Sequence, residues 1–141
     1  MTIETIFSAA NIGAMAGWLL LALSPLRRGP ILLAARGVGV LLAVVYAGLM
    51  ISRMSSGAPM DFTRLDGLAV AFSNPSVMLV GWIHYLAFDL WVGAWQAEVA
   101  PKWGVPHWAL LPCLFLTFMF GPMGLLLFLI VAGVFKLTRK A

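Results

Sequence analysis

Hydrophobic residues fill four long stretches of this chain, and short polar segments separate them. The segment 5–26 holds 22 residues without a charge, which is enough helix to cross a hydrocarbon core about 30 Å thick. The same argument gives predicted spans at residues 4–26, 31–52, 75–97 and 106–135. The pattern therefore predicts an all-α integral membrane protein, folded as a bundle of four transmembrane helices.

The last stretch is longer than a membrane requires. It has no charge from residue 103 to residue 135, which corresponds to about 50 Å of helix. Such a segment must tilt, kink or begin at the interface. Pro106, Pro112 and Pro122 supply places for a kink.

The longest polar joint predicts a short helix between the second and third spans. Ser55, Ser56, Gly57, Ala58 and Pro59 favour a turn. Residues 61–72 then mix charged and apolar side chains, which is typical of an amphipathic helix lying at the lipid headgroups. Asn74 is a favourable N-cap and Pro75 suits a first helical turn, so the third span should begin there.

Composition and charge exclude several classes of protein. Of the 141 residues, 62% are hydrophobic and only 10% are charged, so the chain could not cover the surface of a soluble domain. We expect residues 1–141 to form a single membrane domain. The net charge of +4 does not indicate nucleic-acid binding, because the basic residues flank the spans in separate clusters.

Membrane orientation should follow the distribution of lysine and arginine. With four spans, one side would collect Arg27, Arg28, Arg36 and Lys102. The other side would collect Arg53, Arg64, Lys136, Arg139 and Lys140. Four against five does not decide the orientation.

The start of the chain has neither a basic segment before its apolar stretch nor an Arg-rich transit pattern. We therefore expect the first span to be retained and the protein to lie in a bacterial plasma membrane. Small residues recur every four positions in the first two spans, at Ala9, Gly13 and Gly17 and at Gly39, Ala43 and Ala47. Such faces let helices approach closely within a bilayer. Homo-oligomerisation is left open.

Candidate functional residues lie where polar groups fall in mid-membrane, because such groups are costly there unless they serve a purpose. The third span places His84, Tyr85 and Asp89 near the middle of the bilayer. His84 and Asp89 are about 140° apart around a helix, whereas Tyr85 and Asp89 share a face. Arg36 enters within about a turn of the level of Asp89 and is its predicted charge partner. Without that base, the acid would be protonated and act as a donor.

Other spans bring further residues to this depth. They include Asn11 of the first span and Tyr46 of the second, while Pro122 frees a carbonyl in the fourth. Aromatic side chains add walls suited to a flat, apolar, conjugated ligand, although ordinary helix packing would also use them. The predicted ligand-binding residues are Asn11, Tyr46, Trp82, Phe88, Trp91, Phe118, Gly121 and Pro122.

Neither haem nor a metal ion is expected. His84 and His107 would lie roughly 20 Å apart along the membrane normal, so one iron could not bind both within a subunit. A metal site needs three or four ligands, and only His84 and Asp89 are at hand.

The run Gly81-Trp82-Ile83-His84-Tyr85-Leu86-Ala87-Phe88-Asp89-Leu90 carries a family resemblance, together with Pro112-Cys113-Leu114 and the segment 118–127. Over about residues 62–129 the chain resembles the abscisic-acid-deficient-four-like family. In plants, members of this family are plastid membrane proteins needed to make neoxanthin from violaxanthin. Bacterial members carry the label of a domain of unknown function. Ala94 stands where the family usually has an arginine.

The resemblance implies binding of a carotenoid or apocarotenoid and a cofactor-independent isomerisation of its end group. His84 and Asp89 would then be the acid–base candidates, with Tyr85 as a hydrogen-bond donor. Two other classes stay open: a non-catalytic protein that binds a pigment or lipid, and a structural membrane subunit.

Overall fold

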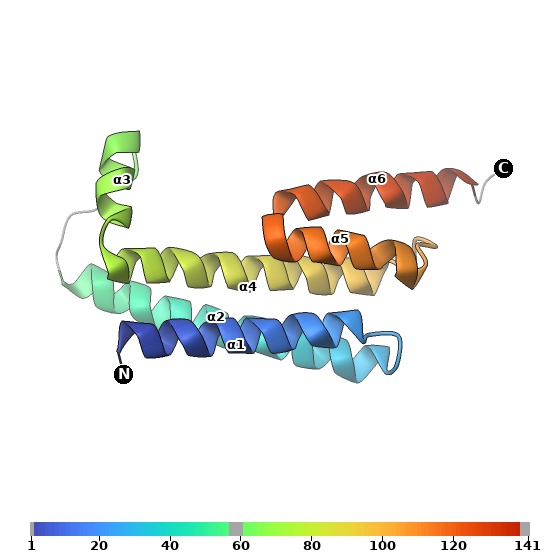
Figure 1. Ribbon diagram of the computed structural model, residues 1–141, viewed down its shortest axis with the longest axis horizontal. Coiled ribbons are helices and arrows are strands. Elements are labelled where there is room, and N and C mark those ends of the chain that lie inside the picture. The colour runs from blue at the N-terminus through green and yellow to red at the C-terminus, as the bar shows by residue number, and fades with distance from the viewer. Residues whose placement is uncertain (1, 57–60, 139–141) are drawn as a thin grey trace.

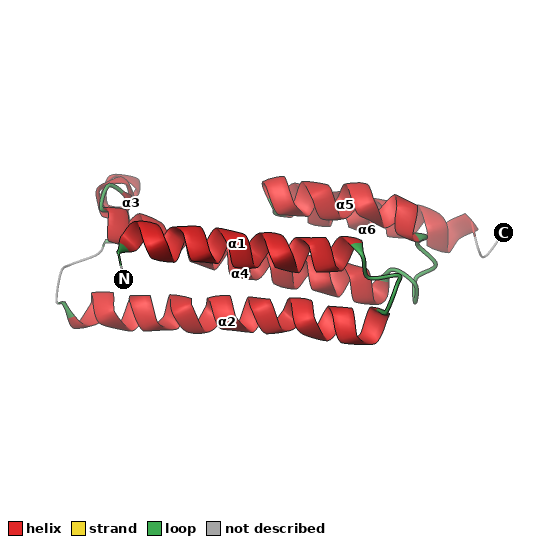
Figure 2. Ribbon diagram, turned by 60° about the horizontal axis from the view of Figure 1, so that its bottom comes forward, coloured by secondary structure: helices red, strands yellow, loops and turns green. Residues whose placement is uncertain are grey.

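The computed structural model describes residues 2–56 and 61–138, and these ranges form six helices and no strand (Figures 1 and 2). The helices are α1 (Ile3–Ala22), α2 (Arg28–Ser55), α3 (Leu65–Phe72), α4 (Pro75–Val99), α5 (His107–Phe120) and α6 (Pro122–Thr138). Gly57, Ala58 and Pro59 of the predicted turn lie outside the described residues, as do Arg139 and Lys140.

Three of the helices are long and apolar enough to cross a membrane. They are α1, α2 and α4, with 20, 28 and 25 residues. Their existence confirms the first three predicted elements and is consistent with a membrane protein. The predicted start of α4 is also confirmed, because the Asn74 side chain accepts a hydrogen bond from the backbone N–H of Ser76 at 2.9 Å and Pro75 opens the helix.

α4 is the central helix and contacts each of the other five. α1 and α2 run along its length, while α5 and α6 lie over its C-terminal half (Figure 1). Glycine allows the close approach: an added Cβ at Gly17 of α1 would lie 2.7 Å from a methyl carbon of Leu90 on α4. α2 and the α5–α6 pair lie on opposite sides of the layer formed by α1 and α4 (Figure 2).

The prediction of one helix across residues 106–135 is wrong. α5 ends at Phe120, and α6 begins at Pro122 and returns alongside α5 as an antiparallel hairpin (Figures 1 and 2). The turn residue, Gly121, has φ +42°, a backbone conformation that other L-residues adopt only with strain. Gly124 then permits close contact, because an added Cβ there would lie 2.0 Å from the backbone nitrogen of Thr117.

A short helix also forms where residues 61–72 predicted one. It is α3, which runs across the direction of the long helices at the N-terminal end of α4 (Figure 1). None of its eight residues is fully buried. Its location at a membrane surface stays a prediction.

Candidate functional site

His84 lines a pocket formed by α2, the segment leading into α3, α3 itself and α4. The cavity volume is about 390 Å³. The walls are mostly apolar, and His84, Tyr46 and Arg53 are the lining residues that carry polar side-chain groups. The full lining is Tyr46, Met50, Arg53, Phe62, Phe72, Val77, Val80, Gly81 and His84.

The imidazole of His84 lies between two aromatic rings. Its centroid is 5.4 Å from that of Tyr46 on α2 and 4.7 Å from that of Phe88, one turn further along α4. His84 is exposed at the protein surface, and its ring nitrogens form no hydrogen bond within residues 2–56 and 61–138. Both nitrogens are therefore available to a ligand in the pocket.

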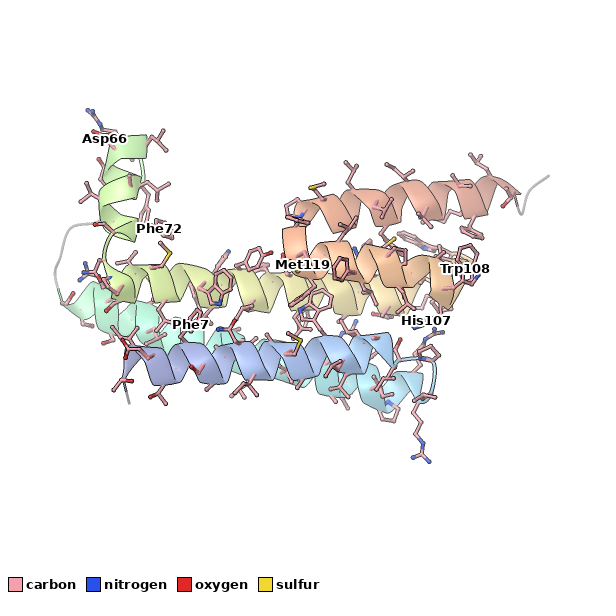
Figure 3. All side chains as sticks on the ribbon, in the orientation of Figure 1. Phe7, Asp66, Phe72, His107, Trp108 and Met119 are labelled. Atoms are coloured by element: carbon pink, nitrogen blue, oxygen red, sulfur yellow. The ribbon has the colours of Figure 1, made fainter. Side chains whose placement is uncertain are left out.

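A second cluster joins the middle of α4 to the tip of the α5–α6 hairpin. The hydroxyl of Tyr85 donates a hydrogen bond to the carbonyl of Met119 at 3.1 Å and lies 3.5 Å from that of Phe118. Figure 3 shows Met119 at the hairpin tip, over the middle of α4. These carbonyls are near the end of α5, where intrahelical donors run out. Tyr85 thus fastens the hairpin to α4.

Asp89 lies on the same face as Tyr85 and touches the turn of the hairpin. An added Cβ at Gly121 would be 2.7 Å from its Oδ1 atom and 3.1 Å from its Oδ2 atom. Oδ2 is buried and has no hydrogen-bond partner among the described residues. The carboxylate of Asp89 therefore leaves no room for a side chain at position 121.

Trp82 links the remaining candidates. Its indole Nε1 donates a hydrogen bond to Oδ1 of Asn11 at 3.1 Å, and its ring stacks on Tyr85 with centroids 5.6 Å apart. The ring of Phe118 packs against that of Trp18 on α1, with centroids 5.5 Å apart. Pro122 begins α6 directly after the turn.

The structure does not bring all candidates to one site. His84 faces the pocket, whereas Asp89 is not among the pocket residues and lies against the hairpin. Arg36 is not paired with Asp89 as predicted. Its guanidinium forms a salt bridge with Glu98, near the end of α4, and lies 5.9 Å from the ring centroid of Trp91.

Two polar residues of α4 were missed by the sequence reasoning. Glu98 forms salt bridges with Arg36 and with Lys102, the latter at 3.0 Å. The i, i+4 spacing of Glu98 and Lys102 was the sequence signal for an ion pair. Gln96 is completely buried, and its Nε2 atom donates to the hydroxyl of Thr117 at 3.0 Å. That hydroxyl donates in turn to the carbonyl of Cys113 at 2.8 Å. The sequence signal for Gln96 was a side-chain amide within the otherwise apolar run 94–97.

The Arg36–Glu98 pair can be tested by a double-mutant cycle. We expect Arg36→Met and Glu98→Gln to lower the melting temperature by less in combination than the sum of the two single effects, because both remove the same ion pair. The same cycle between Arg36→Met and Asp89→Asn should be additive. Thermal melts of detergent-purified protein give both results, and coupling to Asp89 instead of Glu98 would contradict the observed pairing.

Within the described part of the chain, no group of three or more His, Cys, Asp and Glu side chains is placed to hold a metal ion. A family model described as ABA DEFICIENT 4-like matches residues 5–128 of the chain. No curated protein and no solved structure matches the chain.

Proposed function

Because the chain belongs to the ABA DEFICIENT 4-like family, we propose that it binds a carotenoid or apocarotenoid in a bacterial plasma membrane, with the end group of the ligand beside Tyr46 and His84. The observation that carries this proposal is the apolar pocket of about 390 Å³ with an unbonded imidazole in its wall. The resemblance of the run 81–90 to neoxanthin-forming proteins supplies the ligand class.

The pocket suits one ring of such a ligand. Its volume lies in the range of small-molecule sites, which are mainly hydrophobic with a few polar groups that fix orientation. Phe62 and Phe72 supply flat apolar walls, and Tyr46 and His84 supply the polar groups. A polyene with two end rings is about as long as a bilayer is thick, roughly 30 Å, so its chain would continue among the lipids.

The proposed reaction is an isomerisation of an epoxide end group to an allenic alcohol. A general acid gives a proton to the epoxide oxygen as its C–O bond breaks, and a base takes a proton from a carbon next to the ring. The two transfers balance, so neither an oxidant nor a cofactor is consumed. His84 is the proton-transfer residue in the pocket, and the hydroxyl of Tyr46 is a second donor. Tyr85 donates a hydrogen bond to the tip of the hairpin and Asp89 lies against its turn, and neither residue lines the pocket.

One observation favours a non-catalytic pigment-binding role as the second candidate. Asp89, the other predicted acid–base residue, does not line the pocket. The pocket therefore contains one of the two groups expected to exchange protons. A protein that only binds the pigment would not need a second acid–base residue in the pocket.

The test uses detergent-purified protein incubated with violaxanthin. We expect His84→Phe to keep the bound pigment and to lower conversion by about 100-fold, because the ring packing stays while the proton-transfer nitrogens are lost. Met50→Trp should fill the pocket and lower pigment binding about tenfold, which is 1.4 kcal/mol of affinity. Visible absorption after gel filtration measures binding, and chromatography of the extracted pigment measures conversion.

Phe115→Ala is the control, because Phe115 is 62% exposed on α5 and does not line the pocket. Unchanged binding in Met50→Trp would overturn the proposed site. Pigment that binds to the unsubstituted protein without conversion would establish the non-catalytic role instead.

A further inference from the structure

The two helices of the C-terminal hairpin are shorter than the hydrocarbon core of a membrane is thick. α5 has 14 residues and α6 has 17, which correspond to about 21 Å and 25 Å of helix. The hydrocarbon core is about 30 Å thick. α1, α2 and α4, with 20 residues or more, reach that length.

The tip of the hairpin lies at the middle of α4. Asp89 touches Gly121 at the turn, and it is the fifteenth residue of a helix that begins at Pro75 and has 25 residues. If α4 spans the membrane, the turn therefore lies deep within the hydrocarbon core. Met119 over the middle of α4 in Figure 3 agrees with this placement.

Both open ends of the hairpin lie at the C-terminal end of α4. At the start of α5, Nε2 of His107 is 2.9 Å from the carbonyl oxygen of Ala22, the last residue of α1 (Figure 3). Near the end of α6, the ammonium group of Lys136 is 3.9 Å from the ring centroid of Trp103, in the connection between α4 and α5. The hairpin therefore begins and ends at the same level.

We propose that α5 and α6 form a re-entrant hairpin, which enters and leaves the membrane on one side. The chain then has three membrane spans, with Thr2 and Thr138 on opposite sides. Helix–turn–helix backbone at membrane depth is tolerated where it is packed against protein. Here α4 packs against one side of the tip, where Gly121 is buried, and the hydroxyl of Tyr85 donates a hydrogen bond to the carbonyl of Met119.

This topology changes the charge balance and fixes the orientation. Lys136 moves to the side of Arg27, Arg28, Arg36 and Lys102, and Arg139 and Lys140 directly follow α6 in the sequence. Only Arg53 and Arg64 remain on the other side. Of the seven basic residues in the described part of the chain, five thus share one side, and the positive-inside rule places that side in the cytoplasm.

The orientation also identifies the leaflet that supplies the ligand, a step that rests on the proposed function. The pocket is lined by the end of α2, by α3 and the segment before it, and by the first half of α4. The end of α2 and α3 lie toward the N-terminal end of α4, opposite to the open ends of the hairpin (Figure 1). The pocket is therefore in the outer half of the membrane, and its ligand enters from the leaflet that faces away from the cytoplasm.

Cysteine labelling in intact bacterial cells tests the topology without any ligand. The native Cys113, which is buried, is first replaced by Cys113→Ala. Single cysteines are then placed at three exposed positions, as Leu26→Cys, Ser73→Cys and Thr138→Cys, none of which changes a charge. We expect a membrane-impermeant maleimide to label only Ser73→Cys in intact cells, and all three after permeabilisation.

Labelling of Thr138→Cys together with Ser73→Cys would overturn the re-entrant hairpin, because a fourth full span puts these two positions on one side. Labelling of Leu26→Cys and Thr138→Cys but not Ser73→Cys would overturn the orientation. A green fluorescent protein fused after the last residue of the unsubstituted chain gives an independent answer if a cysteine variant fails to fold. Its fluorescence, which needs the cytoplasm, is expected, and its loss with a folded membrane protein would refute the proposal.

Discussion

Replacing Gly124 by alanine is expected to open the α5–α6 hairpin and to lower the free energy of unfolding by about 3 kcal/mol or more. The new Cβ would lie 2.0 Å from the backbone nitrogen of Thr117, 2.2 Å from its hydroxyl and 2.4 Å from its Cα. Because backbone atoms cannot rotate away, α6 must move off α5. That movement would also disturb the buried hydrogen bond between Thr117 and Gln96.

Gly133→Ala is the matched control in the same helix. An added Cβ there meets nothing within 4 Å, and alanine is the better helix former by about 1 kcal/mol. Thermal unfolding in detergent, followed by gel filtration, should therefore show a large loss for Gly124→Ala and no loss for Gly133→Ala. Equal melting temperatures for the two variants would mean that α5 and α6 do not pack as observed.

The three long helices were predictable because their signal is strong and local. Runs of about 20 apolar residues bounded by charges admit few other structures, and Asn74 and Pro75 fixed the start of α4 to the residue. α2 begins at Arg28 and ends at Ser55, beyond the predicted limits of 31–52. The prediction counted only the apolar stretch, whereas the helix itself continues into the charged residues Arg28 and Arg53.

The hairpin could not be predicted with the same methods. Residues 103–135 carry no charge, so nothing in the hydropathy marks a reversal, and Pro122 alone is equally compatible with a kinked span. The decisive features are the positive φ of Gly121 and the absence of a side chain at Gly124. Neither feature can be interpreted from the sequence, because both depend on how α5 and α6 are placed relative to each other.

The candidate residues were recognisable by type, but their partners were not. Counting residues from the ends of antiparallel spans placed Arg36 near Asp89, and the structure places it beside Glu98, nine residues further along α4. The angular relation was more dependable: the 140° between His84 and Asp89 agrees with their separate surroundings.

The contact between Asp89 and Gly121 predicts a large and specific coupling. Gly121→Ala should cost about 2–3 kcal/mol, because alanine is strained at φ +42° and its Cβ would lie 2.7 Å from the carboxylate of Asp89. Asp89→Ala removes the collision and leaves the backbone strain. In the Asp89→Ala background, Gly121→Ala should therefore cost about 1 kcal/mol less, a coupling that unfolding of the four proteins in detergent can measure.

His84→Ala supplies the control for this cycle, since His84 is on the same helix but faces the pocket. Its effect and that of Gly121→Ala should add within about 0.5 kcal/mol. If the effects of Asp89→Ala and Gly121→Ala were also additive, the turn of the hairpin would not lie against the carboxylate. The depth of the turn, and with it the argument for a re-entrant hairpin, would then be lost, because the contact with Asp89 is what places Gly121 at mid-membrane.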